Sequence, residues 1–178
     1  VKVHLAADTG MGRIGFALRT DFQKAIDEMV AVCRLPGLTM TGMFQHFAVA
    51  DDTAPENIAY TAEQYAYFIR AYQALKAAGC EPPLLHCDNS AAVMLHPDWP
   101  EGLPANHCMA RPGIILYGFD PSDEVRFGLF RPVMKLKTVV SMVKEMQPGQ
   151  STSYGRCFTA EKPTKVATLC TGYADGYP

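Results

Sequence analysis

The sequence predicts an α/β fold with a parallel sheet, followed by a smaller antiparallel β module. Up to about residue 128, short apolar runs alternate with stretches whose apolar residues recur at helical spacing, which is typical of βα units. From Pro132 onward the apolar residues alternate with period two and helical spacing is absent, which indicates antiparallel strands. We therefore place a domain boundary near residue 130, with 1–130 as the α/β part and 131–178 as the β module.

The α/β part begins with a strand, a glycine-rich turn, a helix and a second strand. Residues 1–7 alternate as in a buried strand, and the turn DTGMGRIG follows them. Apolar residues at helical spacing predict a helix at about 21–34, which Thr20 and Gln23 would begin as a capping box. The run TMTGMFQHF predicts a second strand at about 39–47.

A long helix and two further elements complete this part. The helix is predicted at about 61–78, where large apolar residues line one face and Thr61 with Gln64 would cap the start. A third strand is predicted at 84–88 and leads into a short helix with the sequence NSAAVML. Residues 109–117 predict a further strand or a strand-to-turn element.

The composition excludes several classes of function. Apolar residues make up 48% of the chain and charged residues 19%, which suits a globular protein with a sizeable core. A net charge of −2 without blocks of like charge gives no sign of a nucleic-acid or membrane partner. The six Cys are scattered without a Cys-x-x-Cys pair, so we expect reduced thiols in a cytoplasmic protein. The pairs His86-Cys87 and His107-Cys108 lack the usual spacing of zinc ligands, so we expect no metal site.

Polar residues follow the predicted strands at their carboxyl ends, where parallel α/β folds bind ligands. These residues are Arg13, His46, Asn89, Ser90 and Arg111. Backbone N–H groups at Ser90 and at Gly113-Ile114 could hold a phosphate. Taken singly, each signal also has a plain structural interpretation: Ser90 as a helix N-cap, His46 as a core histidine, and Arg111 as a surface residue.

Six segments taken together resemble the alanine racemases. They are HLAADTGMGRIGF, GMFQHFAVAD, HCDNSAA, ARPGIILYG, PVMKLKTVVSMVKEMQPGQSTSYGRCF and TGYADGYP. The resemblance covers essentially the whole chain and implies an isomerase that depends on pyridoxal 5'-phosphate (PLP). It implies interconversion of L- and D-alanine by a two-base mechanism, which supplies D-alanine for peptidoglycan, in a cytoplasmic homodimer with active sites at the subunit interface.

The same resemblance sharpens the predicted fold. It implies that 1–130 is the second half of a PLP-binding (β/α)8 barrel, a TIM barrel, and that 131–178 is the truncated start of a C-terminal β domain. The lysine that holds the cofactor in the family lies in a motif resembling VKADAYGHG, which this sequence lacks. We therefore expect an internal fragment that does not racemise alanine by itself.

The resemblance also implies roles for individual residues. The cofactor would be bound by His46, Asn89, Ser90, Arg111, Gly113 and Ile114. Arg111 would donate to the pyridine nitrogen and His46 would brace Arg111, while four of the others would surround the phosphate. Arg13 would lie near the phenolic oxygen of the cofactor and the substrate carboxylate. Tyr173 would be the second catalytic base, acting in the partner subunit's site, and would need a pKa below the usual value of about 10.

One position departs from the family pattern, and two alternative functions stay open. Many members carry a lysine where this chain has Ala6, and that lysine orients the arginine that matches Arg13. We hypothesise that a bound anion takes its place. The first alternative function is a racemase for serine or for a broader set of amino acids. The second is a non-catalytic PLP-binding barrel protein, which the β module at 132–178 disfavours.

Overall fold

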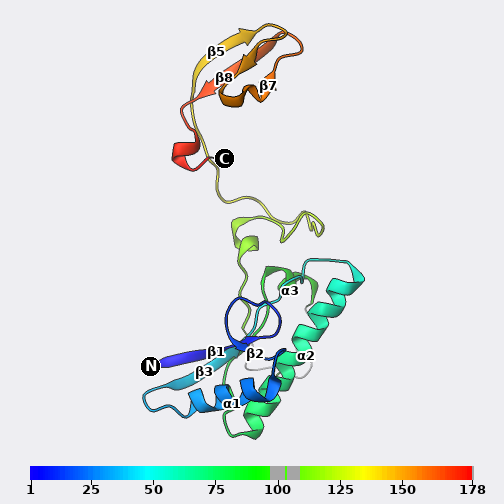
Figure 1. Ribbon diagram of the computed structural model, residues 1–178, viewed down its shortest axis with the longest axis vertical. Coiled ribbons are helices and arrows are strands. Elements are labelled where there is room, and N and C mark those ends of the chain that lie inside the picture. Colours follow the sequence, from blue (N-terminus) through cyan, green and yellow to red (C-terminus); the bar gives the residue numbers. More distant parts are fainter. Residues whose placement is uncertain (97–102, 104–108, 178) are drawn as a thin grey trace. The chain divides into compact units, whose positions relative to one another are not determined.

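The computed structural model describes residues 1–96, 103 and 109–177 (Figure 1). The chain divides into two compact units, Val1–Val133 and Met134–Pro178. His107 and Cys108, which form one of the two His-Cys pairs of the sequence, lie outside the described residues.

A four-stranded parallel sheet organises the first unit. Its strands are β1 (Lys2–Asp8), β2 (Phe16–Ala17), β3 (Thr39–Phe44) and β4 (Leu85–His86), in the order β2-β1-β3-β4. The predicted strands are present, and those at 39–47 and 84–88 are shorter than predicted. The short strand β2 was not predicted.

The segment after residue 108 ends in a turn of 3-10 helix, η1 (Ile114–Tyr117), and not in a strand. Before that turn it runs beside β4, because Met109 N donates to Leu85 O at 3.0 Å and Arg111 N donates to Asp88 O at 2.8 Å. Of the two forms predicted for this segment, the strand-to-turn element is the closer description.

Helix α1 (Phe22–Cys33) agrees with the predicted range of about 21–34, whereas α2 (Pro55–Ala77) begins before the predicted residue 61. Helix α1 is capped by Asp21, whose side chain accepts from Lys24 N at 3.0 Å, so the predicted capping box at Thr20 is wrong. Helix α2 begins at Pro55, which has no N–H to leave unpaired in a first turn. Helix α3 (Ser90–Leu95) is capped by Asn89, which accepts from Ala92 N at 3.0 Å.

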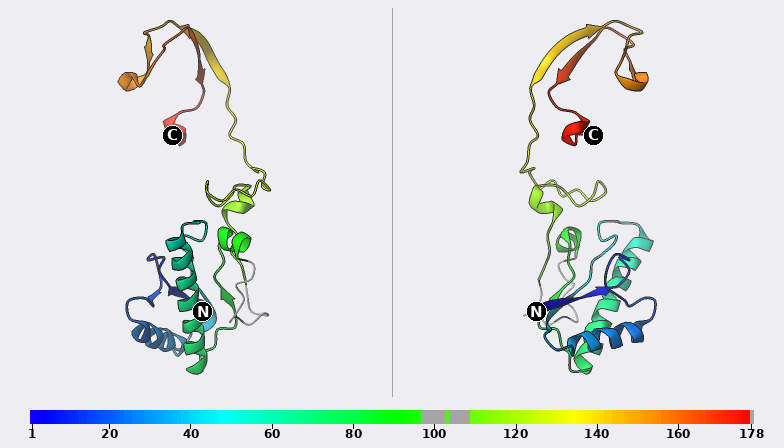
Figure 2. Two further views of the ribbon diagram at one scale, coloured as in Figure 1. Left: turned by 90° about the vertical axis from the view of Figure 1, so that its right-hand side faces the viewer. Right: turned by 60° about the vertical axis from the view of Figure 1, so that its left-hand side comes forward.

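The apolar core lies between the sheet and helices α1 and α2 (Figure 1 and Figure 2). Its most buried large side chains are Leu18, Met29, Met43, Phe47, Phe68, Leu75 and Leu85. Successive strand residues point to opposite faces of a sheet, and in β1 the buried residues are Leu5 and Ala7. His4 and Ala6 therefore point to the other face, away from the helices, where the polar groups described below gather.

The second unit is antiparallel, as predicted. Strand β5 (Val140–Met146) pairs with β8 (Thr164–Leu169), and β6 (Ser151–Thr152) pairs with β7 (Phe158–Thr159). Two short 3-10 helices, η2 (Tyr154–Arg156) and η3 (Tyr173–Asp175), follow β6 and β8. Within the described part of the chain, we find no helix with both the length and the apolar character needed to span a membrane.

Candidate active site

The loop after β1 is a turn built on Asp8. Its Oδ1 atom accepts from the backbone N–H groups of Gly10 and Gly12, both at 3.0 Å. Gly10 and Gly12 have φ angles of 136° and 69°, which side-chain-bearing residues rarely adopt. The turn carries Arg13 to the edge of a cavity at the carboxyl end of the sheet.

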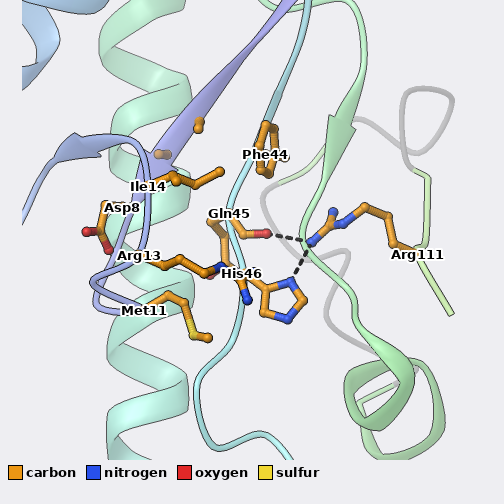
Figure 3. A pocket seen from close by; sticks show the side chains of 10 residues that line it. Asp8, Met11, Arg13, Ile14, Phe44, Gln45, His46 and Arg111 are labelled. Atoms are coloured by element: carbon orange, nitrogen blue, oxygen red, sulfur yellow. Dashed lines mark hydrogen bonds between the residues drawn. The ribbon is translucent and has the colours of Figure 1, made fainter. Parts of the chain in front are cut away.

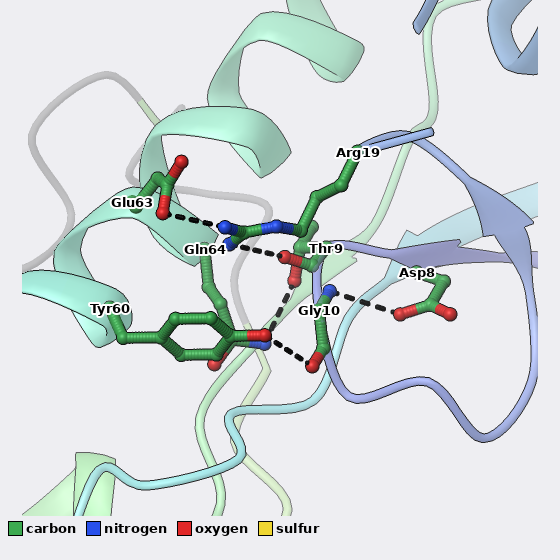
Figure 4. A network of polar contacts seen from close by, with 7 residues as sticks. All are labelled: Asp8, Thr9, Gly10, Arg19, Tyr60, Glu63 and Gln64. Atoms are coloured by element: carbon green, nitrogen blue, oxygen red, sulfur yellow. Dashed lines mark hydrogen bonds and ion pairs between the residues drawn. The ribbon is translucent and has the colours of Figure 1, made fainter. Parts of the chain in front are cut away.

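Helix α2 fixes this loop through polar contacts (Figure 4). Tyr60 Oη donates to Gly10 O at 2.7 Å. Gln64 is fully buried, and its Nε2 donates to Thr9 Oγ1 at 3.2 Å and to His46 O at 3.0 Å. Arg19 forms an ion pair with Glu63 at 2.8 Å, and its guanidinium lies 4.6 Å from the centre of the Tyr60 ring. The helix thus holds both the loop after β1 and the residues after β3.

Arg111 is held by groups at the carboxyl ends of β3 and β4, and Figure 3 shows its contacts with Gln45 and His46. Its Nη2 donates to Gln45 O at 2.7 Å and lies 3.4 Å from His46 Nδ1. Its Nη1 lies 2.6 Å from His86 Nδ1. His46 therefore contacts Arg111, as the resemblance implied, but His86 makes the shorter contact. Among the described residues, Arg111 and Arg13 form no salt bridge.

The electrostatics of the site keep both histidines neutral. Burial, followed by the charge of Arg111 and the neighbouring His4, lowers the pKa of His86 to about 4. Burial, then Arg111 and Arg13, lowers the pKa of His46 below its usual value. Burial also lowers the pKa of Arg111, although a guanidinium stays charged near neutral pH. The site therefore presents positive charge next to neutral imidazoles.

A second group of residues surrounds a neighbouring cavity of about 260 Å³. It includes all six residues that the resemblance assigns to the cofactor, namely His46, Asn89, Ser90, Arg111, Gly113 and Ile114. Gly113 N donates to Ser90 Oγ at 2.7 Å, which leaves the hydroxyl hydrogen of Ser90 available to a ligand. Asn89 caps α3, so the N-cap interpretation of Ser90 does not hold. His46 and Arg111 line this cavity and also the adjacent one of about 240 Å³ that contains Arg13.

The donor set of the two cavities fits PLP, whose phosphate, phenolic oxygen and ring nitrogen all accept hydrogen bonds. Arg13 and Arg111 only donate, and Ser90 has a hydroxyl hydrogen to give. Gln45 lines the smaller cavity, and its Nε2 is the one buried side-chain nitrogen or oxygen of the described residues without a hydrogen-bond partner. A buried donor without an acceptor is costly, so this atom also favours an acceptor-rich ligand.

Tyr173 is the one predicted site residue outside the first unit. It begins η3 in the second unit and its side chain is exposed. Its role as a base stays a prediction. The anion proposed beside Ala6 also stays a prediction. Ala6 lines the smaller cavity with the charged Arg13, which favours an anion, and with the apolar Ile14 and Phe44, which do not.

Two contributors to the site were missed from the sequence. His86 was considered only as half of a metal pair with Cys87, and among the described residues no cluster of three or more His, Cys, Asp or Glu side chains could hold a metal. Gln45 directly precedes His46 and was not considered. The alternation of side chains along β4 is the signal that could have revealed His86, because it separates His86 from Cys87.

Comparison with known proteins matches both units to one family. Residues 1–121 match the model of the alanine racemase N-terminal domain, and residues 133–178 match that of the alanine racemase C-terminal domain. This chain belongs to the alanine racemase family. It is 43% identical to the alanine racemase of Desulforamulus reducens over an alignment of 178 residues that covers 99% of this chain and 45% of that protein. It is 41% identical to the alanine racemase of Clostridium tetani, of which it covers 43%.

Solved structures of the family agree with this assignment. The alanine racemase of Streptomyces coelicolor matches with a TM-score of 0.78 and 32% identity, over 99% of this chain and 45% of that one. The alanine racemase of Clostridium difficile 630 matches with a TM-score of 0.73 and 35% identity, over 99% of this chain and 43% of that one. The predicted fold class, a partial TIM barrel followed by the start of a β domain, is confirmed. The chain spans less than half the length of the relatives it matches.

Proposed function

We propose that this chain is part of a PLP-dependent alanine racemase, an isomerase that interconverts L- and D-alanine and supplies D-alanine for peptidoglycan. The observation that carries the proposal is that six residues, predicted one by one, line a single cavity, and that neither Arg111 among them nor the nearby Arg13 forms a salt bridge within the described part of the chain. The proposal extends to a cytoplasmic homodimer, as in the expectation from the sequence.

The residues of this chain would divide the work as follows. When bound, PLP supplies an electron sink for charge that develops at the α-carbon of an amino acid. The Ser90 hydroxyl and the backbone N–H of Ile114 would bind the phosphate, and Gly113, whose own N–H donates to Ser90 Oγ, would hold that hydroxyl in place. Arg111 would donate to the ring nitrogen and, because a guanidinium does not give up its proton, would leave that nitrogen unprotonated. Arg13 would place positive charge near the phenolic oxygen and the substrate carboxylate.

Racemisation requires one group that removes a proton from one face of the α-carbon and another that delivers a proton to the opposite face. We propose Tyr173 Oη as the group on one face, acting in the partner subunit's site. The lysine for the other face would come from a part of the protein that this chain does not include. The 178-residue chain alone is therefore expected to be inactive.

The names of the relatives favour alanine over serine or a broader set of substrates, since those quoted above are alanine racemases. The match of residues 133–178 to the racemase C-terminal domain disfavours a non-catalytic PLP-binding barrel protein. The substrate is tested by incubating the purified full-length protein with L-alanine or L-serine and PLP, and following the D-isomers by chiral chromatography. Faster turnover of serine than of alanine would overturn the proposal that alanine is the substrate. No turnover of either amino acid would overturn the proposed racemase activity.

The phosphate site has a test that does not depend on activity. Ser90→Ala should weaken binding of PLP but leave binding of pyridoxal, which lacks the phosphate, unchanged. Ser141→Ala is the matched control, because Ser141 is an exposed serine of β5 whose hydroxyl donates only to Thr168 O. Binding is measured by fluorescence of the cofactor. Equal weakening of both ligands by Ser90→Ala would contradict the phosphate site.

A further inference from the structure

Arg111 is the end of a chain of three side chains. His4 Nδ1 lies 2.7 Å from His86 Nε2, and His86 Nδ1 lies 2.6 Å from Arg111 Nη1. His4 belongs to β1 and His86 to β4, which are separated in the sheet by β3. The chain of contacts therefore crosses a whole strand to reach the arginine.

Gly42 of β3 makes this crossing possible. It is the register partner of His4, and a Cβ atom there would come within 2.8 Å of His4 Cε1 and 2.9 Å of His4 Nδ1. The His4 ring therefore occupies the space that a side chain at position 42 would need, which only glycine leaves free. The next residue on this face, Phe44, stacks on the His86 ring with 5.1 Å between centroids and a 7° tilt, which fixes the plane of that ring.

The positions of the protons follow from Arg111. A guanidinium only donates, so His86 Nδ1 must accept, and the proton of neutral His86 lies on Nε2. That N–H then donates to His4 Nδ1, which accepts. The tautomer of His86 and the direction of both hydrogen bonds are therefore set.

We propose that His4 is a positioning residue for Arg111. As the acceptor for His86 Nε2–H, it selects the tautomer of His86 whose Nδ1 can accept from Arg111. Without that acceptor, His86 can place its proton on Nδ1, where it opposes the Arg111 N–H. In the described part of the chain, Arg111 Nη1 has His86 Nδ1 as its acceptor, whereas Nη2 donates to the backbone oxygens of Gln45 and Cys87. The consequence for catalysis rests on the proposed function of the site.

Two variants of His4 distinguish the effect of its hydrogen-bond acceptor from the effect of its ring. His4→Phe keeps a ring of similar size but removes the acceptor. His4→Asn removes the ring but can place an oxygen near the position of Nδ1. Thr41→Val is the matched control, since it removes one side-chain hydrogen bond, to Val3 O, from the same sheet.

In the full-length protein loaded with PLP, His4→Phe should lower kcat for alanine by about threefold to tenfold, the loss expected for one neutral hydrogen bond, with little change in KM. His4→Asn should recover most of that loss, and Thr41→Val should leave kcat unchanged. Equal kcat for His4→Phe and the control would overturn the proposal, as would equal losses in the Phe and Asn variants.

The tautomer is measured directly by ¹⁵N NMR of the histidine rings in the full-length protein. We expect His86 to carry its proton on Nε2 in the wild type and in His4→Asn, and to show Nδ1 protonation in His4→Phe. A wild-type His86 with its proton on Nδ1 would overturn the proposal. This measurement needs no turnover, so a wild-type protein without racemase activity would refute the proposed function while the NMR result still decides the role of His4.

Discussion

Replacing Gln64 by leucine should destabilise the first unit and loosen the site together. Gln64 is fully buried on the inner face of α2. Its Oε1 accepts from Ala48 N at 3.0 Å, and its Nε2 donates to His46 O and to Thr9 Oγ1 at 3.0 and 3.2 Å. One side chain therefore joins the helix to the loop after β1 and to the segment after β3.

The expected loss in the free energy of unfolding is about 1–4 kcal/mol. Leucine is one atom shorter and cannot form hydrogen bonds, so Ala48 N–H and His46 C=O lose their partners. A partly buried backbone group left unpaired costs about 1–3 kcal/mol, and two such groups set the range once the apolar gain of leucine is subtracted. Thr9 keeps its bond to Gln45 Oε1 at 2.8 Å and adds little.

Urea denaturation followed by circular dichroism measures this loss. Gln23→Leu is the control, because Gln23 lies on the exposed side of α1 and makes one bond, to Asp27, at 2.9 Å; its effect should stay below about 0.5 kcal/mol. Gln64→Leu should also weaken PLP binding, since His46 lines both cavities. If Gln64→Leu and Gln23→Leu shift the midpoint equally, Gln64 does not join these segments.

Three further predictions concern the sheet and the core. Gly42→Ala should cost about 1–3 kcal/mol by overpacking, because the new Cβ would lie 2.8 Å from Leu84 O and from the His4 ring; an unchanged urea midpoint would contradict this. The pKa of His86 is about 4 in the folded protein, against 6.5 in the unfolded chain. The unfolded chain therefore binds a proton first, and the free energy of unfolding should fall by up to about 3 kcal/mol as the pH falls from 6.5 to 4. An NMR titration of His86 with a midpoint near 6.5 would contradict this. Phe68→Ala removes a side chain with 0% exposure and should cost about 3–5 kcal/mol, whereas Ile58→Ala on the exposed side of α2 should cost far less; equal losses in denaturation would refute the core position of Phe68.

The alternation of strands and helices was predictable because it depends on local apolar spacing, but the start of α2 was not. Its first turns, from Pro55 to Tyr60, contain no buried residue, and the apolar Ile58 is exposed, so the helical pattern becomes visible only near Tyr65. Thr61 and Gln64, predicted as caps, instead lie inside the helix and face inward. Thr61 Oγ1 donates back to Asn57 O at 2.8 Å, which satisfies a polar group that the sequence pattern placed at a helix end.

The meeting in one cavity of the six residues proposed to bind the cofactor was predictable from topology, because parallel strands place their carboxyl ends at one edge. The support of that cavity was not predictable in the same way. Gln64 and His4 act on the site from distant parts of the chain, through hydrogen bonds whose partners depend on which face each side chain occupies. Gly42 contributes by having no side chain at all, and only the register of β1 with β3 shows why.

The way in which Arg111 is held has an electrostatic consequence. Its contacts are carbonyl oxygens and two neutral imidazoles, and no carboxylate among the described residues forms an ion pair with it. A carboxylate would orient a guanidinium equally well but would cancel its charge. Neutral acceptors orient Arg111 without a direct ion pair, although the charge of the nearby Asp88 acts on it, so positive charge remains available to an acceptor-rich ligand. The low pKa of His86 therefore helps to hold Arg111, because a protonated His86 could no longer accept a hydrogen bond from the guanidinium.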